Sequence, residues 1–217
     1  MIGDKLVITD YHRQAAALIY KHIYPFLEKH EKPFAITVAG ESGCGKSETA
    51  AVLADIIGKA GLKVIILQQD DYFLYPPRTN HEKRAEDISW VGPKEVRLDL
   101  IDQNINQVKT GLSNTLVKPL INYDRDEIVQ EQLYVEGVKA VIAEGTYTTL
   151  LKNADFKAFI DRTYLQTKKA RLLRSREKYS LFIEQVLSIE HEIISGHKNM
   201  ADLVIPPPEE EAVSADF

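Results

Sequence analysis

The sequence is poor in cysteine, in basic charge and in long apolar runs, and each absence argues against a class of protein. A single cysteine, Cys44, in 217 residues leaves no partner for an intramolecular disulfide. The net charge of −5 lacks the basic excess typical of a general nucleic-acid binder. No apolar segment approaches the roughly 18 residues needed to span a bilayer, and the N-terminus has no signal-peptide pattern. We therefore expect a cytoplasmic protein with no nucleic-acid or membrane partner.

The composition that is present is that of an ordinary globular α/β protein. Hydrophobic residues make up 44% of the chain and charged residues 27%, and the length suits one large domain with a sizeable core. We predict a single domain over residues 1–217. Residues 206–217, with three prolines and three consecutive glutamates, indicate a frayed acidic tail.

Helical and strand patterns alternate along the chain. Helical spacing covers 15–27, 50–60 and 94–109, and apolar strand-like runs cover 34–38, 64–67, 139–143, 162–165 and 202–205. Such alternation predicts a mostly parallel sheet with helices on both faces. The polar stretch 70–93, interrupted by prolines, indicates an excursion at an active site.

The segment from Gly40 to Ser47 fits the phosphate-binding pattern G-x-x-x-x-G-K-[ST] without a mismatch. Its glycines let the backbone N–H groups converge on one concavity, and the following helix adds its N-terminal partial charge. A glycine-rich turn with an incidental lysine has the same letters, but the strand before and the helix after favour a phosphate loop. The residues expected at a nucleoside triphosphate are Gly40, Glu41, Ser42, Gly43, Cys44, Gly45, Lys46, Ser47 and Glu48.

Acidic residues follow two of the expected strands. Asp70 and Asp71 come directly after one strand, and Glu144 comes directly after another. Ligands of open parallel sheets bind outside the C-terminal ends of the strands, so these carboxylates can converge on a magnesium triphosphate. A kinase needs one carboxylate to accept a hydroxyl proton and oxygen ligands for its metal. The alternative is structural: the aspartates cap a turn, and Glu144 pairs with a lysine.

With these motifs the chain resembles the uridine kinase and phosphoribulokinase group of P-loop kinases, to which pantothenate kinase is related. The resemblance covers most of the chain. It is carried by the loop Gly40–Ser47, the segment Gln69-Asp70-Asp71-Tyr72-Phe73, Pro119 upstream of Glu144-Gly145, a basic lid segment, and the closing Ala201-Asp202-Leu203-Val204-Ile205-Pro206.

The resemblance implies a P-loop three-layer sandwich with a small helical lid, and an ATP- and Mg²⁺-dependent reaction. It implies transfer of the γ-phosphoryl group to a small molecule's hydroxyl, with uridine or another nucleoside as the first acceptor to consider. Asp70 is implied as the base, and Lys46 is expected to reach the β- and γ-phosphates. Ser47, Asp70 and Glu144 are implied as the metal site.

The basic segment 168–176 lies within the expected lid, at about 168–180. Arg171 and Arg174 are three residues apart and so share a helical face. The resemblance implies that these arginines cover the transferred phosphoryl group and stabilise its charge. A solvated basic helix face, with Glu177 nearby, remains the alternative.

The chain departs from uridine kinases where they recognise the nucleoside. Ser89-Trp90-Val91-Gly92-Pro93 replaces an Asn-Phe-Asp-His-Pro-like stretch, and Ile121 and Asp126 stand in the places of a tyrosine and a histidine. The substrate candidates are Asp71, Tyr72, Tyr123 and Asp126, although a polar turn and core packing explain them equally well. A non-nucleoside acceptor, such as pantothenate, a sugar, a sugar phosphate or glycerate, therefore stays open. So does a nucleotide-binding role without kinase activity.

Cys44 suggests a second hypothesis. A thiol beside the loop amides and Lys46 would have a lowered pKa and be sensitive to oxidation or alkylation, unless burial removes that sensitivity.

Overall fold

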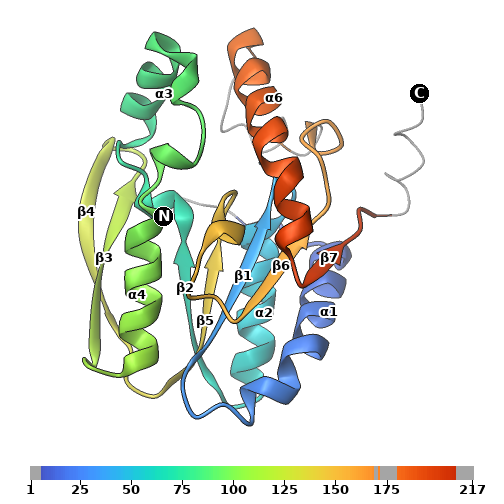
Figure 1. Ribbon diagram of the computed structural model, residues 1–217, viewed down its shortest axis with the longest axis vertical. Helices are drawn as coiled ribbons and strands as arrows, with labels where there is room; N and C mark the ends of the chain where they lie inside the picture. Colours follow the sequence, from blue (N-terminus) through green and yellow to red (C-terminus); the bar gives the residue numbers. More distant parts are fainter. Residues whose placement is uncertain (1–5, 169–170, 172–179, 209–217) are drawn as a thin grey trace.

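A five-stranded parallel sheet forms the centre of the computed structural model, which describes residues 6–168, 171 and 180–208 (Figure 1). In spatial order its strands are β2 (Lys63–Gln68), β5 (Val138–Glu144), β1 (Phe34–Gly40), β6 (Phe156–Ile160) and β7 (Leu203–Ile205). Every neighbouring pair is parallel. Each residue of β1 is buried, as expected for a central strand covered on both faces.

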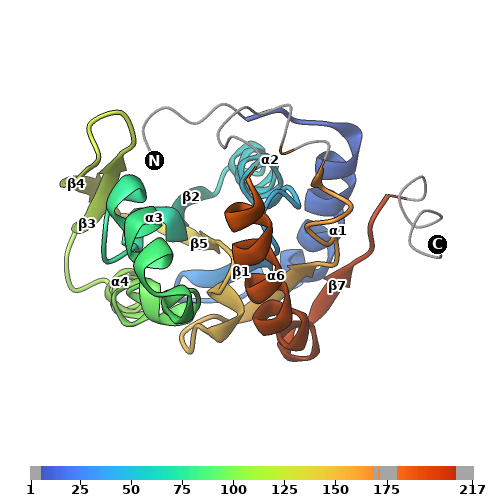
Figure 2. The ribbon, with the colours of Figure 1, turned by 90° about the horizontal axis from the view of Figure 1, so that it is seen from above.

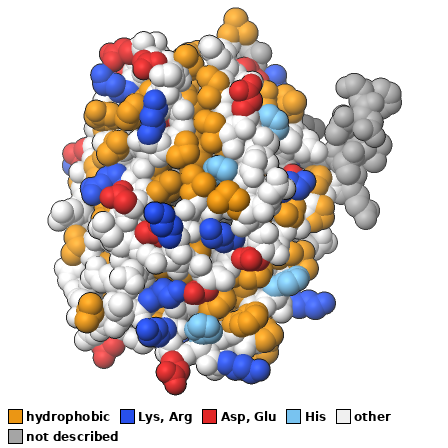
Figure 3. All heavy atoms as spheres, viewed as in Figure 1, with side chains coloured by type: hydrophobic (Ala, Val, Ile, Leu, Met, Phe, Trp, Pro, Cys, Tyr) orange, Lys and Arg blue, Asp and Glu red, His pale blue; other side chains and the backbone are white. Residues whose placement is uncertain are grey.

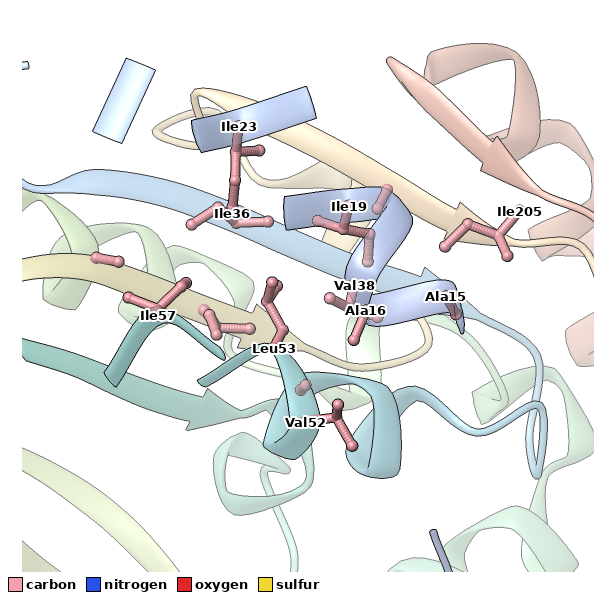
Figure 4. Close-up of a cluster of buried hydrophobic side chains, with 14 of the residues drawn as sticks. Ala15, Ala16, Ile19, Ile23, Ile36, Val38, Val52, Leu53, Ile57 and Ile205 are labelled. Carbon is pink, nitrogen blue, oxygen red and sulfur yellow. The ribbon is translucent and has the colours of Figure 1, made fainter. Parts of the chain in front are cut away.

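Helices cover both faces of this sheet, which confirms the three-layer α/β prediction (Figures 1 and 2). On one face lie α1 (Asp10–Leu27) and α2 (Lys46–Lys59), and on the other α4 (Leu98–Thr110) and α6 (Leu181–Ser195). In the cluster drawn in Figure 4, Ile19 and Ile23 of α1 meet Leu53 of α2 over Ile36 of β1. Among the described helices, none is long and apolar enough to cross a bilayer.

The strand register aligns the C-terminal ends of β1, β5 and β2 at one edge of the sheet. Val38 pairs with Glu144 across β1 and β5, and Gln68 pairs with the same Glu144 across β2 and β5. Because the strands are parallel, the loops that follow β1, β2 and β5 leave the sheet side by side. The phosphate loop and the acids after the strands therefore converge although they are distant in sequence.

The hairpin of β3 (Thr115–Asn122) and β4 (Glu127–Tyr134), the helix α3 (Pro77–Glu86) and the helix α6 were not predicted. The hairpin is antiparallel, and α3 occupies part of the polar stretch (Figure 1). In α3 only Asn80 is buried, so the helix has no apolar stripe for a periodicity argument to find. Its N-terminus is instead held by Asp126 of the hairpin turn, whose carboxylate accepts from the Arg78 N–H at 2.6 Å and the Thr79 hydroxyl at 3.2 Å.

Several predicted boundaries need correction. Residues 162–165 do not form a strand: the strand of that region is β6, and Arg162 already lies in the loop beyond it. The helix expected from residue 94 begins at Leu98, because Pro93–Glu95 forms a separate 3₁₀ turn. Most of the predicted lid and the end of the acidic tail fall outside the described residues. The remaining 3₁₀ helices are Gln69–Tyr72, Ile88–Trp90, Thr148–Leu150 and Gly196–Met200.

Candidate active site

The phosphate loop lies between β1 and α2, in the strand-loop-helix context that its sequence pattern requires. Gly43 has φ +76° and Gly45, the N-cap of α2, has φ +100°, a region that side chains with a Cβ rarely adopt. A Cβ at Gly43 would also stand 2.5 Å from Cγ of Arg171. Both glycines are therefore required by conformation, and Gly43 also by the close approach of Arg171.

Lys46 is held inside the loop that it follows. Its Nζ donates a hydrogen bond to the Glu41 carbonyl at 2.8 Å. Burial alone would lower the pKa of Lys46, but nearby acidic groups, among them the carboxylates of Glu144 and Asp70, more than offset that effect and raise it. The ammonium group therefore stays charged at neutral pH.

Glu48 is buried in the first turn of α2. We therefore expect any contact between Glu48 and a nucleotide to come from its backbone N–H and not from its carboxylate.

A hydroxyl and a carboxylate meet at the expected metal site. The Ser47 hydroxyl donates to Glu144 Oε1 at 3.0 Å, and Asp70 lies close enough to Glu144 for its charge to affect it. Burial, followed by the repulsion of Asp70, raises the pKa of Glu144 to about 7. A bound cation would relieve both effects. Such hard oxygen donors fit Mg²⁺, which keeps several waters and phosphate oxygens in its shell. The described residues contain no cluster of three or more His, Cys, Asp or Glu able to hold a metal by themselves.

Asp70 is the acid that faces open space. Its side chain is exposed to solvent, and it lies on the wall of a pocket of about 610 Å³. Protein on the remaining sides reduces its hydration, and this raises its pKa against the opposing effect of Lys46.

Its neighbour Asp71 points the other way and is 1% exposed. Its carboxylate accepts from Lys118 Nζ at 2.8 Å and from the Ile121 N–H at 3.1 Å, which fastens the hairpin to the end of β2. Tyr72 is also fully buried, and its hydroxyl accepts from Asn104 Nδ2 at 2.8 Å. The structure therefore places Asp71 and Tyr72, both substrate candidates from the sequence, in the scaffold beneath the pocket.

The pocket beside Asp70 is assembled from segments far apart in the sequence. Tyr123 and Asp126, the other two substrate candidates, both line it. The lining comprises Ser42, Asp70, Phe73, Tyr75, Pro77, Arg78, Asn80, His81, Arg84, Ile121, Tyr123, Asp126, Thr146, Ser180, Ile183, Val186 and Glu190. It therefore runs from the phosphate loop past Asp70 to α3, the hairpin and α6.

A buried ion cluster joins two walls of this pocket. Arg84 of α3 makes two hydrogen bonds to Glu95, at 2.6 and 3.1 Å, and one to Glu190 of α6 at 3.0 Å. Glu95 is fully buried and also accepts from Asn80 and from the Gly92 N–H. Sequence reasoning missed this cluster, because nothing local to Arg84 indicates partners 11 and 106 residues away.

The residues that lead into the predicted lid contact the phosphate loop. Thr167 is buried and donates its hydroxyl to the Ser42 carbonyl at 3.0 Å. Arg171 donates from Nη2 to the Tyr164 carbonyl, whereas its Nε is buried without a hydrogen-bond partner among the described residues. A buried unpaired guanidinium N–H is costly unless a ligand satisfies it. The second lid arginine, Arg174, lies outside the described residues.

The carboxylate of Glu41 connects the phosphate loop to α6. The sequence did not predict this contact. The Glu41 carboxylate accepts from the Tyr164 N–H at 2.7 Å and lies 2.7 Å from Nδ1 of His191. Glu190, the preceding residue of α6, belongs to the ion cluster that joins two walls of the pocket. One turn of α6 therefore contacts both the phosphate loop and the pocket.

Cys44 does not have the environment that its reactivity would need. Its thiol is fully buried, and burial raises its pKa in spite of the nearby positive charge of Lys46. The hypothesis of a lowered pKa is therefore wrong, and burial removes the expected sensitivity.

Comparisons with known proteins agree with this fold and loop. The model of the phosphoribulokinase / uridine kinase family matches residues 35–174. A uridine kinase from Lactobacillus helveticus is 26% identical over 203 residues, covering 87% of this chain and 93% of that protein. The bifunctional alpha-galactosidase/sucrose kinase AgaSK of Mediterraneibacter gnavus is 23% identical and matches 88% of this chain but 22% of its own length. The structure of a possible uridine kinase from Bacillus stearothermophilus has a TM-score of 0.65 at 17% identity, covering 89% of this chain and 98% of that one.

Proposed function

We propose that this chain, which belongs to the phosphoribulokinase / uridine kinase family of P-loop kinases, transfers the γ-phosphoryl group of ATP to a hydroxyl group of a small molecule. The observation that carries the proposal is the position of Asp70. This carboxylate lies on the wall of a pocket that also reaches Ser42 of the phosphate loop, and it is close to the Ser47–Glu144 pair. An acceptor in the pocket would therefore meet a base and a triphosphate at the same place.

Asp70 has the exposure that a general base requires. An acceptor hydroxyl placed within hydrogen-bond distance of its carboxylate gives up its proton to Asp70 as the oxygen attacks the γ-phosphorus. The bond from the γ-phosphorus to the β,γ-bridging oxygen breaks, and ADP leaves. We expect Asn to be unable to take that proton while still filling the same space. Asp70→Asn should therefore abolish turnover and leave nucleotide binding intact.

We infer that three groups stabilise the negative charge of the transferred group, two of them side chains of this chain and the third a bound metal ion. Lys46 keeps its charge inside the loop, and the unpaired Nε of Arg171 is a donor for a phosphate oxygen. Mg²⁺, held in part by Ser47, Asp70 and Glu144, would supply further charge neutralisation when bound. We keep Arg174 as a proposed partner of Arg171.

Uridine or another nucleoside is the first acceptor to test, because uridine kinases are among the relatives of this chain. A non-nucleoside acceptor is the second candidate, and a specific observation favours it. Ile121 and Asp126 stand where uridine kinases are expected to have a tyrosine and a histidine; Ile121 is apolar, and the Asp126 carboxylate is already bound to the N-terminus of α3. A site without those polar groups should select a different acceptor. The sucrose kinase part of AgaSK's name makes sugars the next compounds to test.

The deciding experiment is acceptor-dependent ADP release. The panel should contain uridine, cytidine, other nucleosides, pantothenate, ribulose phosphate, glycerate, sucrose and simple sugars, each with Mg-ATP. We expect one compound to stimulate release in the wild type and none to do so in Asp70→Asn. Near-normal turnover by Asp70→Asn would overturn the assignment of the base. ATP binding without turnover on any acceptor would argue for a nucleotide-binding role without kinase activity.

A further inference from the structure

The N-terminal helix α1 precedes the segment that the family model matches, yet it reaches the phosphate loop. The match begins at residue 35, whereas α1 spans Asp10–Leu27. Ala15, Ile19 and Ile23 pack this helix onto the sheet and α2 (Figure 4). The helix is therefore an integral part of the fold, and its first turn has a fixed position.

In that first turn, the side chain of His12 lies against Gly45. The imidazole is 5% exposed, and its Nε2 is 2.4 Å from the point where a Cβ of Gly45 would stand. Gly45 is the residue at which the chain turns from the phosphate loop into α2. The ring thus supports the loop at a peptide whose orientation determines where its N–H groups point.

The protonation of the ring follows from its other contact. The Thr9 N–H donates to Nδ1 of His12 at 3.0 Å. A backbone N–H can only donate, so Nδ1 carries no proton, and the neutral imidazole has its N–H at Nε2, on the edge beside Gly45. The same bond belongs to the capping box of α1, in which His12 is the third helical residue.

A second contact fixes the first turn to the edge of the sheet. The Tyr11 hydroxyl donates to the Pro206 carbonyl at 3.1 Å, and the Arg162 guanidinium lies 5.5 Å from the centre of the Tyr11 ring. Arg162 follows β6 and Pro206 follows β7. Tyr11 and His12 together therefore join the loop after β1 to the ends of two further strands.

This contact lies on the side of the loop away from the acceptor. In the order β2-β5-β1-β6-β7, Asp70 follows β2 at one edge, whereas the partners of Tyr11 follow β6 and β7 at the other. A triphosphate whose reacting end meets Asp70 extends its remaining part away from that edge. A change in the first turn of α1 should therefore affect the nucleotide and not the acceptor.

We propose that His12 is a positioning residue of the nucleotide site, holding the phosphate loop at Gly45 in the conformation that binds polyphosphate. The inference rests only on the nucleotide-binding part of the proposed function and is independent of the acceptor. A preorganised loop binds more tightly because it does not have to be ordered when the ligand arrives. Loss of the ring should therefore weaken Mg-ATP binding.

The variant His12→Gln separates this role from helix capping. Glutamine at the third helical position preserves a capping box with Thr9 but removes the ring from Gly45. His22→Ala is the matched control, because His22 is an exposed histidine on the same helix. Calorimetric titration with Mg-ATP, without acceptor, should show Kd raised on the order of tenfold in His12→Gln, as for other residues that orient ligand-binding groups. The control should bind like the wild type.

Kinetics and melting temperature exclude a general defect. We expect His12→Gln to raise KM for ATP, leave KM for the acceptor unchanged and melt near the wild-type temperature. Wild-type affinity in His12→Gln would overturn the proposal, and so would equal weakening in His22→Ala. Wild-type protein that binds no Mg-ATP would refute the nucleotide-binding role of the loop itself, which is a different result from unchanged affinity.

A measurement on the unmodified protein guards against a variant that does not fold. Imidazole nitrogen spectra should show the Nε2–H tautomer for His12 and a shift of its signals when Mg-ADP is added, with the His22 signals unchanged. His12 signals that stay fixed at saturating Mg-ADP would contradict the proposal.

Discussion

The nucleotide side of this site and the pocket proposed for the acceptor are built in different ways. The phosphate loop comes from one contiguous segment between β1 and α2, and its glycines, Lys46 and Ser47 lie within eight residues. The acceptor pocket takes its walls from the segment after β2, α3, the β3–β4 hairpin and α6. A local motif specifies its own geometry, whereas the pocket depends on ion pairs between residues that are distant in sequence.

The surface charge does not mark the position of the pocket either. On the face drawn in Figure 3, Lys and Arg side chains are interspersed with Asp, Glu and hydrophobic side chains, and no large area carries charge of one sign. The charges that join the walls of the pocket are largely or partly buried, in Glu95, Glu190 and Arg84. Four experiments test whether the two sides differ as described.

The largest effect should separate two adjacent acids. Asp70→Asn should lower kcat by about 10²- to 10⁴-fold, the usual contribution of a general base, a far larger effect than any on the Kd for nucleotide. Asp71→Asn should instead reduce the free energy of unfolding by about 1 to 3 kcal/mol, because it weakens the buried contact with Lys118. Steady-state kinetics and urea unfolding of both variants check this. A fully stable but inactive Asp71→Asn would return that residue to the catalytic site.

The acceptor wall should be the side whose stability depends on buried charge. Arg84→Ala leaves the fully buried Glu95 without its cation and should cost about 3 to 5 kcal/mol of unfolding free energy. Lys59→Ala removes an exposed pair with Asp55 and should cost less than about 0.5 kcal/mol. Urea titrations at equal ionic strength compare them. Similar losses in the two variants would show that the buried cluster is not structural.

The metal side should show a pH-dependent stability that Glu144→Gln removes. In metal-free protein the folded pKa of about 7 exceeds the ordinary value of 4.5, so the folded state binds this proton more tightly. The resulting stabilisation is fully present below pH 4.5 and is lost as the pH rises through 7. At pH 8 in EDTA, the free energy of unfolding of Glu144→Gln should therefore be higher than that of the wild type by on the order of 1 to 3 kcal/mol. The variant should nevertheless lose Mg²⁺-dependent turnover. Thermal unfolding between pH 5 and 8 tests this prediction. A Glu144→Gln variant that is less stable than the wild type at pH 8 would contradict it.

The smallest effect should come from Cys44. Its thiol is fully buried with a raised pKa, so native protein should resist alkylation at neutral pH and react only after unfolding. Thiol titration with and without urea measures this. Rapid stoichiometric labelling of the native protein would restore the idea of a reactive thiol in the loop.

Sequence reasoning predicted the layers of the fold because each depends on periodicity within a short segment. The sequence itself shows the apolar run of β1 and the helical spacing of α1 and α2, and in the structure these residues form a common core. α3 and the hairpin were missed because α3 buries only Asn80 and is held by Asp126 of another element. The candidate site shows the same difference. The sequence predicted Ser47 and Glu144 at one place, and the structure joins them by a hydrogen bond. The sequence did not predict that the side chains of Asp70 and Asp71 point in different directions.

By itself, the sequence determined a phosphate loop, a parallel three-layer fold and acids placed after two other strands of the sheet. These features need only contacts between near neighbours and the common rule for the ends of parallel strands. The tertiary structure alone decided that Asp70 faces the pocket, that Asp71 is buried against Lys118, and that His12 supports Gly45. Each of those outcomes depends on which distant side chain occupies the neighbouring space, and local patterns carry no information about that.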